Sequence, residues 1–152
     1  MFSKMNRNML RLIKKPPQLA YKLGLGRFLG RKVLLLTTIG RKSGLPRVTP
    51  LQYEIINDQI QVSSAMGERT DWMKNIKVNP QISVELGRKK FKATAETSTD
   101  PGLFADYVFH KLSNHPLMTR LIFLFDGIPW NPTREFILDY GKDKAMLFIH
   151  PD

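Results

Sequence analysis

The chain has 152 residues, a net charge of +11 and no cysteine, and 42% of its residues are hydrophobic. This length predicts a single domain over residues 1–152, and the cysteine count excludes disulfides, thiolate catalysis and cysteine-ligated metals. No apolar run reaches the roughly 18 residues of a transmembrane helix and no signal-peptide pattern opens the chain, so we expect a cytoplasmic protein.

The positive charge is concentrated near the N-terminus. Residues 1–47 contain twelve of the 24 Lys and Arg residues and no acid, whereas the remainder contains twelve basic and thirteen acidic residues. Such a segment suits a polyanionic small molecule, an anionic membrane or nucleic acid, and it is equally typical of a solvated basic arm. Because no nucleic-acid recognition motif is present, we expect no nucleic-acid partner.

The first predicted elements are two short helices. Apolar residues at helical spacing predict a basic amphipathic helix over residues 4–13, which two consecutive prolines end. A second helix is predicted at about 17–23, before a glycine-rich stretch. Together they form a basic helical arm over residues 1–30, and residues 1–15 have the composition of a helix that contacts an anionic membrane surface.

Short runs of strand-forming residues with short links follow the arm. Strands are predicted at residues 33–38, 48–56, 59–64, 82–86, 90–96 and 145–149. Helices are predicted at 70–77, from Thr99-Asp100-Pro101 to about Ser113, from His115-Pro116 to about Phe125, and at 133–141. Short links favour antiparallel pairing, so we predict an α+β fold, a small antiparallel barrel of about six strands with flanking N- and C-terminal helices.

The loop between the first two predicted strands concentrates anion-binding chemistry. Its sequence, Gly-Arg-Lys-Ser-Gly-Leu-Pro-Arg over residues 40–47, offers three cations, a hydroxyl and a flexible glycine backbone. Successive backbone N–H groups in such a turn form a nest for an anion, and arginine donors suit phosphate. A basic surface turn is the alternative interpretation, and composition alone leaves both open.

Four segments resemble the deazaflavin-dependent nitroreductase family. Residues 34–51 resemble the signature of that family, and residues 63–67 (Ser-Ser-Ala-Met-Gly) stand where it has a small-residue segment beside the cofactor ring. Residues 71–76 (Asp-Trp-Met-Lys-Asn-Ile) resemble its Asp-Trp-Tyr-x-Asn-Leu helix, and Asn79-Pro80 matches its Asn-Pro before a strand. This sequence departs from the pattern at Met66, where the family often has a lysine.

The resemblance implies a split β-barrel that binds coenzyme F420, with FMN as the alternative cofactor. It implies phosphate and tail contacts within residues 41–47, linker and ring contacts at 48–51, further ring contacts at 63–67, and a pocket wall at 72–76. The implied cofactor-binding residues are Arg41, Lys42, Ser43, Gly44, Pro46, Arg47, Val48, Thr49, Pro50, Leu51, Ser63, Ser64, Ala65, Met66, Gly67, Trp72, Met73, Asn75 and Ile76.

The implied activity is that of an F420H2-dependent reductase. It would transfer a hydride from reduced deazaflavin to an electron-poor small molecule: a quinone, a nitroaromatic or an activated alkene. Since the cofactor supplies the chemistry, we expect no catalytic side chain, and the histidine spacing predicts no metal site. The resemblance also implies a homodimer. Two alternatives stay open: a non-enzymatic carrier of flavin, haem or lipid on the same fold, and an FMN-using reductase.

Overall fold

A computed structural model describes residues 33–152; the predicted N-terminal arm over residues 1–30 lies outside the described residues. The strands are β1 (Val33–Ile39), β2 (Pro46–Gln52), β3 (Glu54–Ile56), β4 (Gln59–Ser64), β5 (Gln81–Leu86), β6 (Lys89–Ser98) and β7 (Ala145–Pro151). The helices are α3 (Asp71–Val78), α4 (Pro101–Asn114), α5 (Pro116–Asp126) and α6 (Arg134–Tyr140), with 3-10 turns η3 (Gly67–Arg69) and η4 (Gly141–Asp143).

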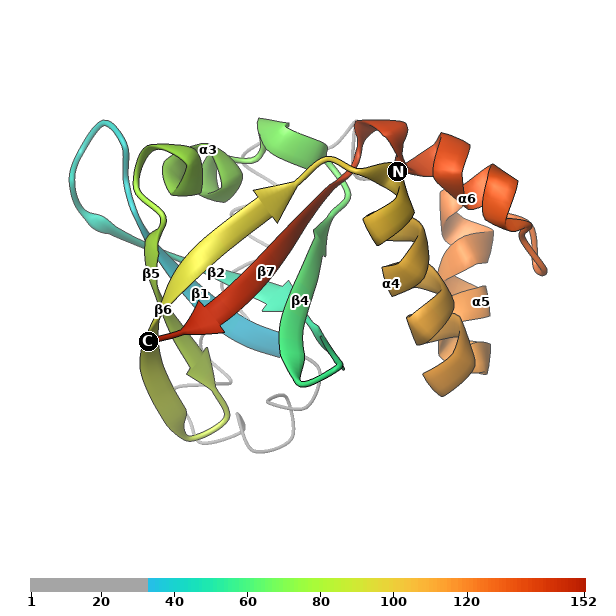
Figure 1. Cartoon of the computed structure of the whole chain (residues 1–152), viewed down its shortest axis with the longest axis horizontal. Coiled ribbons are helices and arrows are strands. Elements are labelled where there is room, and N and C mark those ends of the chain that lie inside the picture. Colours follow the sequence, from blue (N-terminus) through green and yellow to red (C-terminus); the bar gives the residue numbers. More distant parts are fainter. Residues whose placement is uncertain (1–32) are drawn as a thin grey trace.

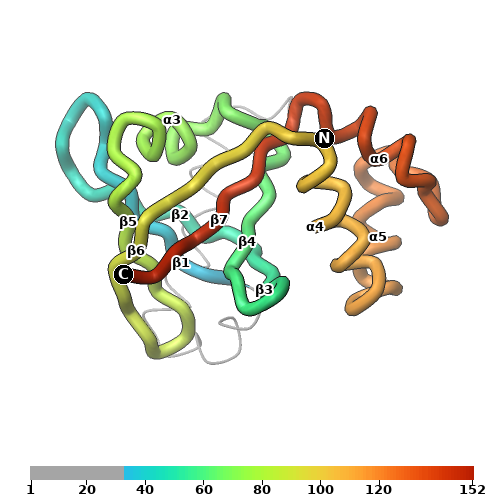
Figure 2. The backbone as a smooth tube through the Cα atoms, viewed as in Figure 1, coloured from blue at the N-terminus to red at the C-terminus, as the bar shows by residue number. Residues whose placement is uncertain are grey.

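The strands form one curled antiparallel sheet (Figure 1). Their order is β2-β1-β5-β6-β7-β4-β3, so β2 and β3 occupy the two edges. Only Tyr53 separates these two strands in the sequence, and the sheet therefore has to curl until its edges approach each other. The backbone trace in Figure 2 follows this curl, which confirms the predicted antiparallel barrel of an α+β protein.

The single strand predicted over residues 48–56 is wrong, because two strands occupy this stretch. β2 pairs with β1 and β3 pairs with β4, and the buried Tyr53 between them marks the change of partner. The described residues therefore contain seven strands, one more than the number expected. The predicted hairpin is confirmed: Asn57 and Asp58 adopt left-handed backbone angles, as a two-residue turn between β3 and β4 requires.

Strand β7 separates two hydrophobic cores. Its residues Ala145, Leu147 and Ile149 face the core inside the barrel, together with the buried side of α3. Met146 and Phe148 face the other way, into a core shared with α4 and α6. Figure 1 shows the consequence: α4, α5 and α6 gather on one side of the barrel, while α3 and the β1–β2 loop lie on the other.

Candidate functional site

The loop between β1 and β2 is a closed turn held by its own hydrogen bonds. The backbone N–H of Gly40 donates to the carbonyl of Leu45, and that of Gly44 donates to the carbonyl of Gly40, both at 2.8 Å. The Leu45 N–H donates to Ser43 Oγ at 3.2 Å. A Cβ on Gly40 would lie 2.6 Å from Ser43 Oγ and 3.2 Å from the carbonyl oxygen of Leu45, so a larger residue there would crowd the closed turn.

Asn75 fastens the loop to α3. Its Oδ1 accepts hydrogen bonds from the backbone N–H of Arg41 at 3.2 Å and from Arg41 Nη1 at 3.0 Å, while its Nδ2 donates to the buried Thr38 Oγ1 at 3.1 Å. Arg41 Nη2 also lies 3.4 Å from Asp71 Oδ1. The guanidinium of Arg41 is thus bound to α3. Asp71 and Thr38 join the site, although they are not among the cofactor-binding residues that the resemblance implies.

The hydrogen-bond donors at the tip of the loop, formed by residues 42–47, face solvent. Lys42, Ser43 and Arg47 are exposed, and Arg47 Nη2 lies 3.4 Å from Ser43 Oγ. Within residues 33–152, the backbone N–H groups of Lys42 and Ser43 donate to no acceptor, and neither Lys42 nor Arg47 has an ion-pair partner. Two free backbone donors beside two cations and a hydroxyl form an arrangement that suits a phosphate.

The other predicted residues near the loop divide into a rim and a core. Gly44, Pro46 and Val48 are exposed beside the tip, while Pro50 and Leu51 are half-buried farther along β2. The remaining members are buried: Thr49, Trp72, Met73 and Ile76. The last three pack inside the barrel, so α3 meets the loop through Asn75 and Asp71.

The segment over residues 63–67 has a shape fixed by two contacts. The buried Ser64 Oγ donates to the carbonyl of Gly67 at 2.7 Å. Gly67 has a left-handed backbone, and a Cβ there would collide with the carbonyl of Asp143. Ala65 is exposed and Met66 is half-buried between them. The segment continues through η3 into α3, and the ring contacts that the resemblance assigns to it stay a prediction.

Tyr107 on α4 joins this segment from the helical side. Its phenol lies close enough to Ser63 for the side chain and the backbone of that residue to act on its pKa. Burial, and then the negative charge of Glu54, raise the pKa of the Tyr107 phenol well above its ordinary value. The phenol is therefore uncharged at neutral pH and keeps its proton at this position.

A cavity of about 200 Å³ opens beside Glu54, between the end of β2 and helices α4 and α5. The carboxylate of Glu54 lies 3.7 Å from His115 Nε2 and 3.9 Å from His110 Nε2, which is too long for hydrogen bonds. Burial lowers the pKa of Lys111, against the opposing effects of Glu54 and Asp126. The cavity is lined by Gln52, Tyr53, Glu54, Lys111, His115, Met118, Thr119 and Ile122.

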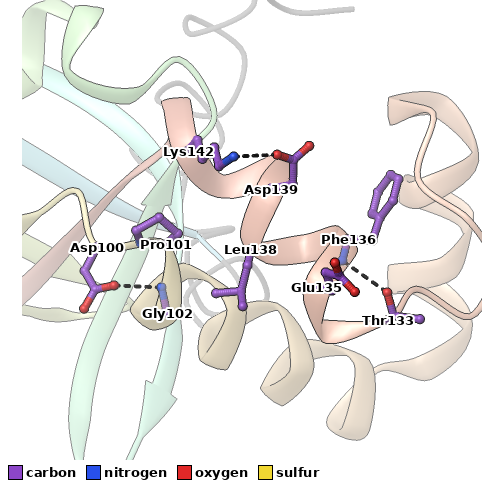
Figure 3. A pocket seen from close by; sticks show the side chains of 9 residues that line it. All are labelled: Asp100, Pro101, Gly102, Thr133, Glu135, Phe136, Leu138, Asp139 and Lys142. Atoms are coloured by element: carbon purple, nitrogen blue, oxygen red, sulfur yellow. Dashed lines mark hydrogen bonds and ion pairs between the residues drawn. The ribbon is translucent and has the colours of Figure 1, made fainter.

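A larger cavity, of about 790 Å³, lies between the start of α4 and α6 (Figure 3). Its lining residues are Asp100, Pro101, Gly102, Thr133, Glu135, Phe136, Leu138, Asp139 and Lys142. Asp100 and Thr133 cap the two helices, and Asp139 pairs with Lys142 at 2.8 Å. These polar groups serve the helix ends, and none of the predicted site residues lines this cavity, so we place the site elsewhere.

Two further properties of residues 33–152 bear on the site. No group of three or more His, Asp and Glu side chains in this range could hold a metal ion. None of its helices is long and apolar enough to cross a membrane. The candidate site is therefore the closed loop with its exposed donors, the α3 residues that anchor it, and the segment over residues 63–67.

Comparison with known proteins identifies the family. The model of a family described as F420H2-dependent quinone reductase matches residues 19–114, more than half of the chain. A curated F420H2-dependent quinone reductase of Mycobacterium tuberculosis (strain H37Rv) is 35% identical over 66 residues, which cover 41% of this chain and 44% of the relative. The alignment thus spans less than half of that relative.

Solved structures agree on the fold. A conserved hypothetical protein of Mycobacterium tuberculosis has a TM-score of 0.58 at 16% identity, over 86% of this chain and 79% of that one. A structure described as an F420H2-dependent reductase has a TM-score of 0.51 at 20% identity, over 79% and 95%. These likenesses confirm the expected split β-barrel. By the match over residues 19–114, the chain belongs to the F420H2-dependent quinone reductase family.

Proposed function

We propose that the protein is an F420H2-dependent oxidoreductase, which transfers a hydride from reduced deazaflavin to an electron-poor small molecule. Membership of the family supports this reaction class. The observation that carries the proposal is the tip of the β1–β2 loop, where the free N–H groups of Lys42 and Ser43 lie beside exposed cations.

The residues present fit the anionic half of coenzyme F420. This cofactor carries a phosphate and an oligoglutamate tail, and both need donors and positive charge at an exposed place. Lys42, Ser43 and Arg47 offer these groups at the rim of the barrel. Arg41 and Asn75 hold the loop in shape, so few degrees of freedom have to be lost on binding.

When bound, the cofactor supplies a hydride, and the protein supplies position. We assign phosphate binding to Lys42, Ser43 and Arg47, and ring contacts to the segment over residues 63–67. The uncharged phenol of Tyr107 holds a proton next to Ser63. Reduction of a quinone by one hydride requires one added proton, and Tyr107 places a neutral hydroxyl beside the proposed ring segment.

The acceptor is proposed from the family and from the residues around the cavity. The family description supports a quinone, and nitroaromatics and activated alkenes share its electron-poor character. The cavity at Glu54 has polar groups from Lys111 and His115 next to the apolar Met118 and Ile122. Such a lining suits a small molecule that has carbonyl acceptors on an otherwise apolar ring.

Titration of the purified protein with F420 tests the proposal. Cofactor fluorescence is expected to change saturably, and an Arg47→Ala variant should bind F420 at least tenfold more weakly, since one charge-assisted contact to the phosphate is lost. Arg88→Ala is the matched control: Arg88 is an exposed arginine in the turn between β5 and β6, and its loss should leave binding unchanged.

The titration has three informative outcomes. Binding of F420 together with turnover of a soluble quinone would support the proposal, whereas saturable binding of FMN alone would replace it by an FMN-using reductase. Tight binding of flavin, haem or lipid without turnover would replace it by a carrier. We further propose a cytoplasmic homodimer, which sedimentation at several protein concentrations and cell fractionation would test.

A further inference from the structure

Helix α5 turns its apolar side away from the protein. Its exposed residues, with their exposed fractions, are Leu117 (65%), Met118 (56%), Leu121 (42%), Leu124 (60%) and Phe125 (74%). At about 100° per residue these five side chains occupy an arc of about 120°. Thr119 and Phe123 lie opposite the arc and are buried against the protein. A surface helix ordinarily shows the reverse arrangement, with its polar side outward.

No polar residue of α5 interrupts this outward face, and Arg120, the one basic residue of the helix, is held at its border. Arg120 Nε donates to the carbonyl of Trp130 at 3.2 Å, and Arg120 Nη2 donates to Asn131 Oδ1 at 3.1 Å. The guanidinium also lies 5.8 Å from the centre of the Trp130 ring. The half-exposed indole of Trp130 is thereby fixed beside the outward face of α5.

The size of this face argues against a folded partner. Given their exposed fractions, and accessible areas of roughly 150–200 Å² for such large apolar residues, the five residues together expose about 550 Å². A stable interface between folded proteins buries about 800 Å² on each side. A lipid surface has no such requirement, because fluid chains adapt to Leu, Met and Phe side chains, while tryptophan and arginine favour the headgroup boundary.

We propose that the outward face of α5, formed by residues 117, 118, 121, 124 and 125 with Trp130 at its border, docks on the surface of a lipid bilayer. The helix lies in the plane of the interface, with its apolar arc toward the acyl chains. Arg120 and Trp130 stand at headgroup level. This surface is formed by other residues than the contact expected for residues 1–15, and the docking does not depend on the cofactor.

Docking also places the cavity at Glu54 next to the lipid. Met118 belongs both to the outward face and to the lining of that cavity, and Ile122 follows it one turn later along α5. A lipid-dissolved acceptor would meet this cavity at the bilayer surface without crossing water. This consequence, unlike the docking itself, rests on the proposed function.

Flotation of the full chain with vesicles of phosphatidylcholine tests the docking. We expect the protein to float at high as well as low salt, because insertion of apolar side chains is not screened, whereas contacts of a basic arm are. A Leu121→Glu, Leu124→Glu double variant should partition at least tenfold less into these vesicles. Val78→Glu is the matched control, since Val78 is an exposed apolar residue on α3 and its change should leave flotation unaltered.

A second measurement keeps the test valid if the double variant fails to fold. Brominated phosphatidylcholine should quench the fluorescence of wild-type Trp130, while Trp72 is buried in the barrel and should be spared. A Trp130→Phe variant should therefore lose most of the quenching.

Three results would overturn the proposal: no flotation of the wild type at high salt, undiminished flotation of a folded double variant, or a dimer that the double variant dissociates without any vesicle binding. The last result would assign the face to a second copy of the chain. Failure of F420 to bind would contradict the proposed function and leave the docking standing.

Discussion

The β1–β2 loop and the cavity at Glu54 are both polar, but they are built differently. In the loop, Arg41 and Asn75 meet at hydrogen-bonding distances of 3.0 and 3.2 Å, and the loop has one shape. Around Glu54, the two imidazoles of His110 and His115 stand 3.7 and 3.9 Å from the carboxylate and form no hydrogen bond to it. The first region is held together by hydrogen bonds between the loop and α3, whereas the charged and polar groups of the second stand apart from one another.

Asn75→Ala should break the loop and have the largest effect. The substitution removes the acceptor of the Arg41 N–H and the donor to the buried Thr38 hydroxyl. We expect the free energy of unfolding to fall by about 2–3 kcal/mol, since buried polar groups lose their partners. Binding of F420 should weaken at the same time. Chemical denaturation and cofactor titration measure the two effects.

Asn79→Ala is the control for this change. Asn79 directly follows α3, and its side chain accepts one exposed hydrogen bond from the Gln81 N–H at 3.1 Å. Its loss should cost less than about 1 kcal/mol and leave cofactor binding unchanged. Equal effects of the two substitutions would show that the loop does not depend on its anchor to α3.

Tyr107→Phe tests the contact between α4 and the segment over residues 63–67, close to Glu54. The change removes the interaction of the phenol with Ser63 and should lower the free energy of unfolding by about 1 kcal/mol at neutral pH. Burial raises the pKa of Tyr107 in the folded state above the unfolded value of about 10. The stabilisation that the neutral phenol gives the fold is therefore complete below about pH 10 and is lost as the pH rises above it. The wild type should therefore lose more stability than the variant above about pH 10. Unfolding curves from pH 8 to 11 that fall in parallel would contradict this.

Glu54→Gln should have the smallest effect on stability, less than about 1 kcal/mol, because its ion pairs are long. The pKa of Tyr107 and that of Lys111 should both fall, since the charge of Glu54 raises each of them. NMR titration of the Lys111 side chain measures this shift. Glu96→Gln, which removes an exposed partner of His150, should leave it unchanged. If Glu54→Gln weakened F420 binding as strongly as Asn75→Ala, the two regions would be one site.

Local chemistry explains what the sequence could predict. Thr70 and Asp100 cap α3 and α4 at the predicted starts of these helices, and such starts can be predicted because a cap depends on residues two or three positions away. The exposed cationic loop between β1 and β2 could be expected for the same reason, since its donors are contiguous in the chain.

Contacts between distant residues explain what the sequence could not predict. Apolar and polar residues continue to alternate through Tyr53. Nothing local therefore shows that β2 and β3 lie at opposite edges of the sheet and pair with different strands. Asn75 lies 34 positions from Arg41, and an asparagine inside a helix does not reveal such a partner. The outward face of α5 has the spacing of an ordinary buried helix face, and only packing shows which side the protein covers.

Strand β2 sets the distance between the β1–β2 loop and the cavity at Glu54. It begins at the β1–β2 loop and ends at the cavity, and Gln52 lies five residue steps of extended chain beyond Arg47. At about 3.4 Å per residue this is a distance of about 17 Å. Pairing with β1 along the whole strand keeps that length constant. A single molecule can touch both ends only if it is itself elongated, so a compact ligand can occupy only one of the two regions at a time.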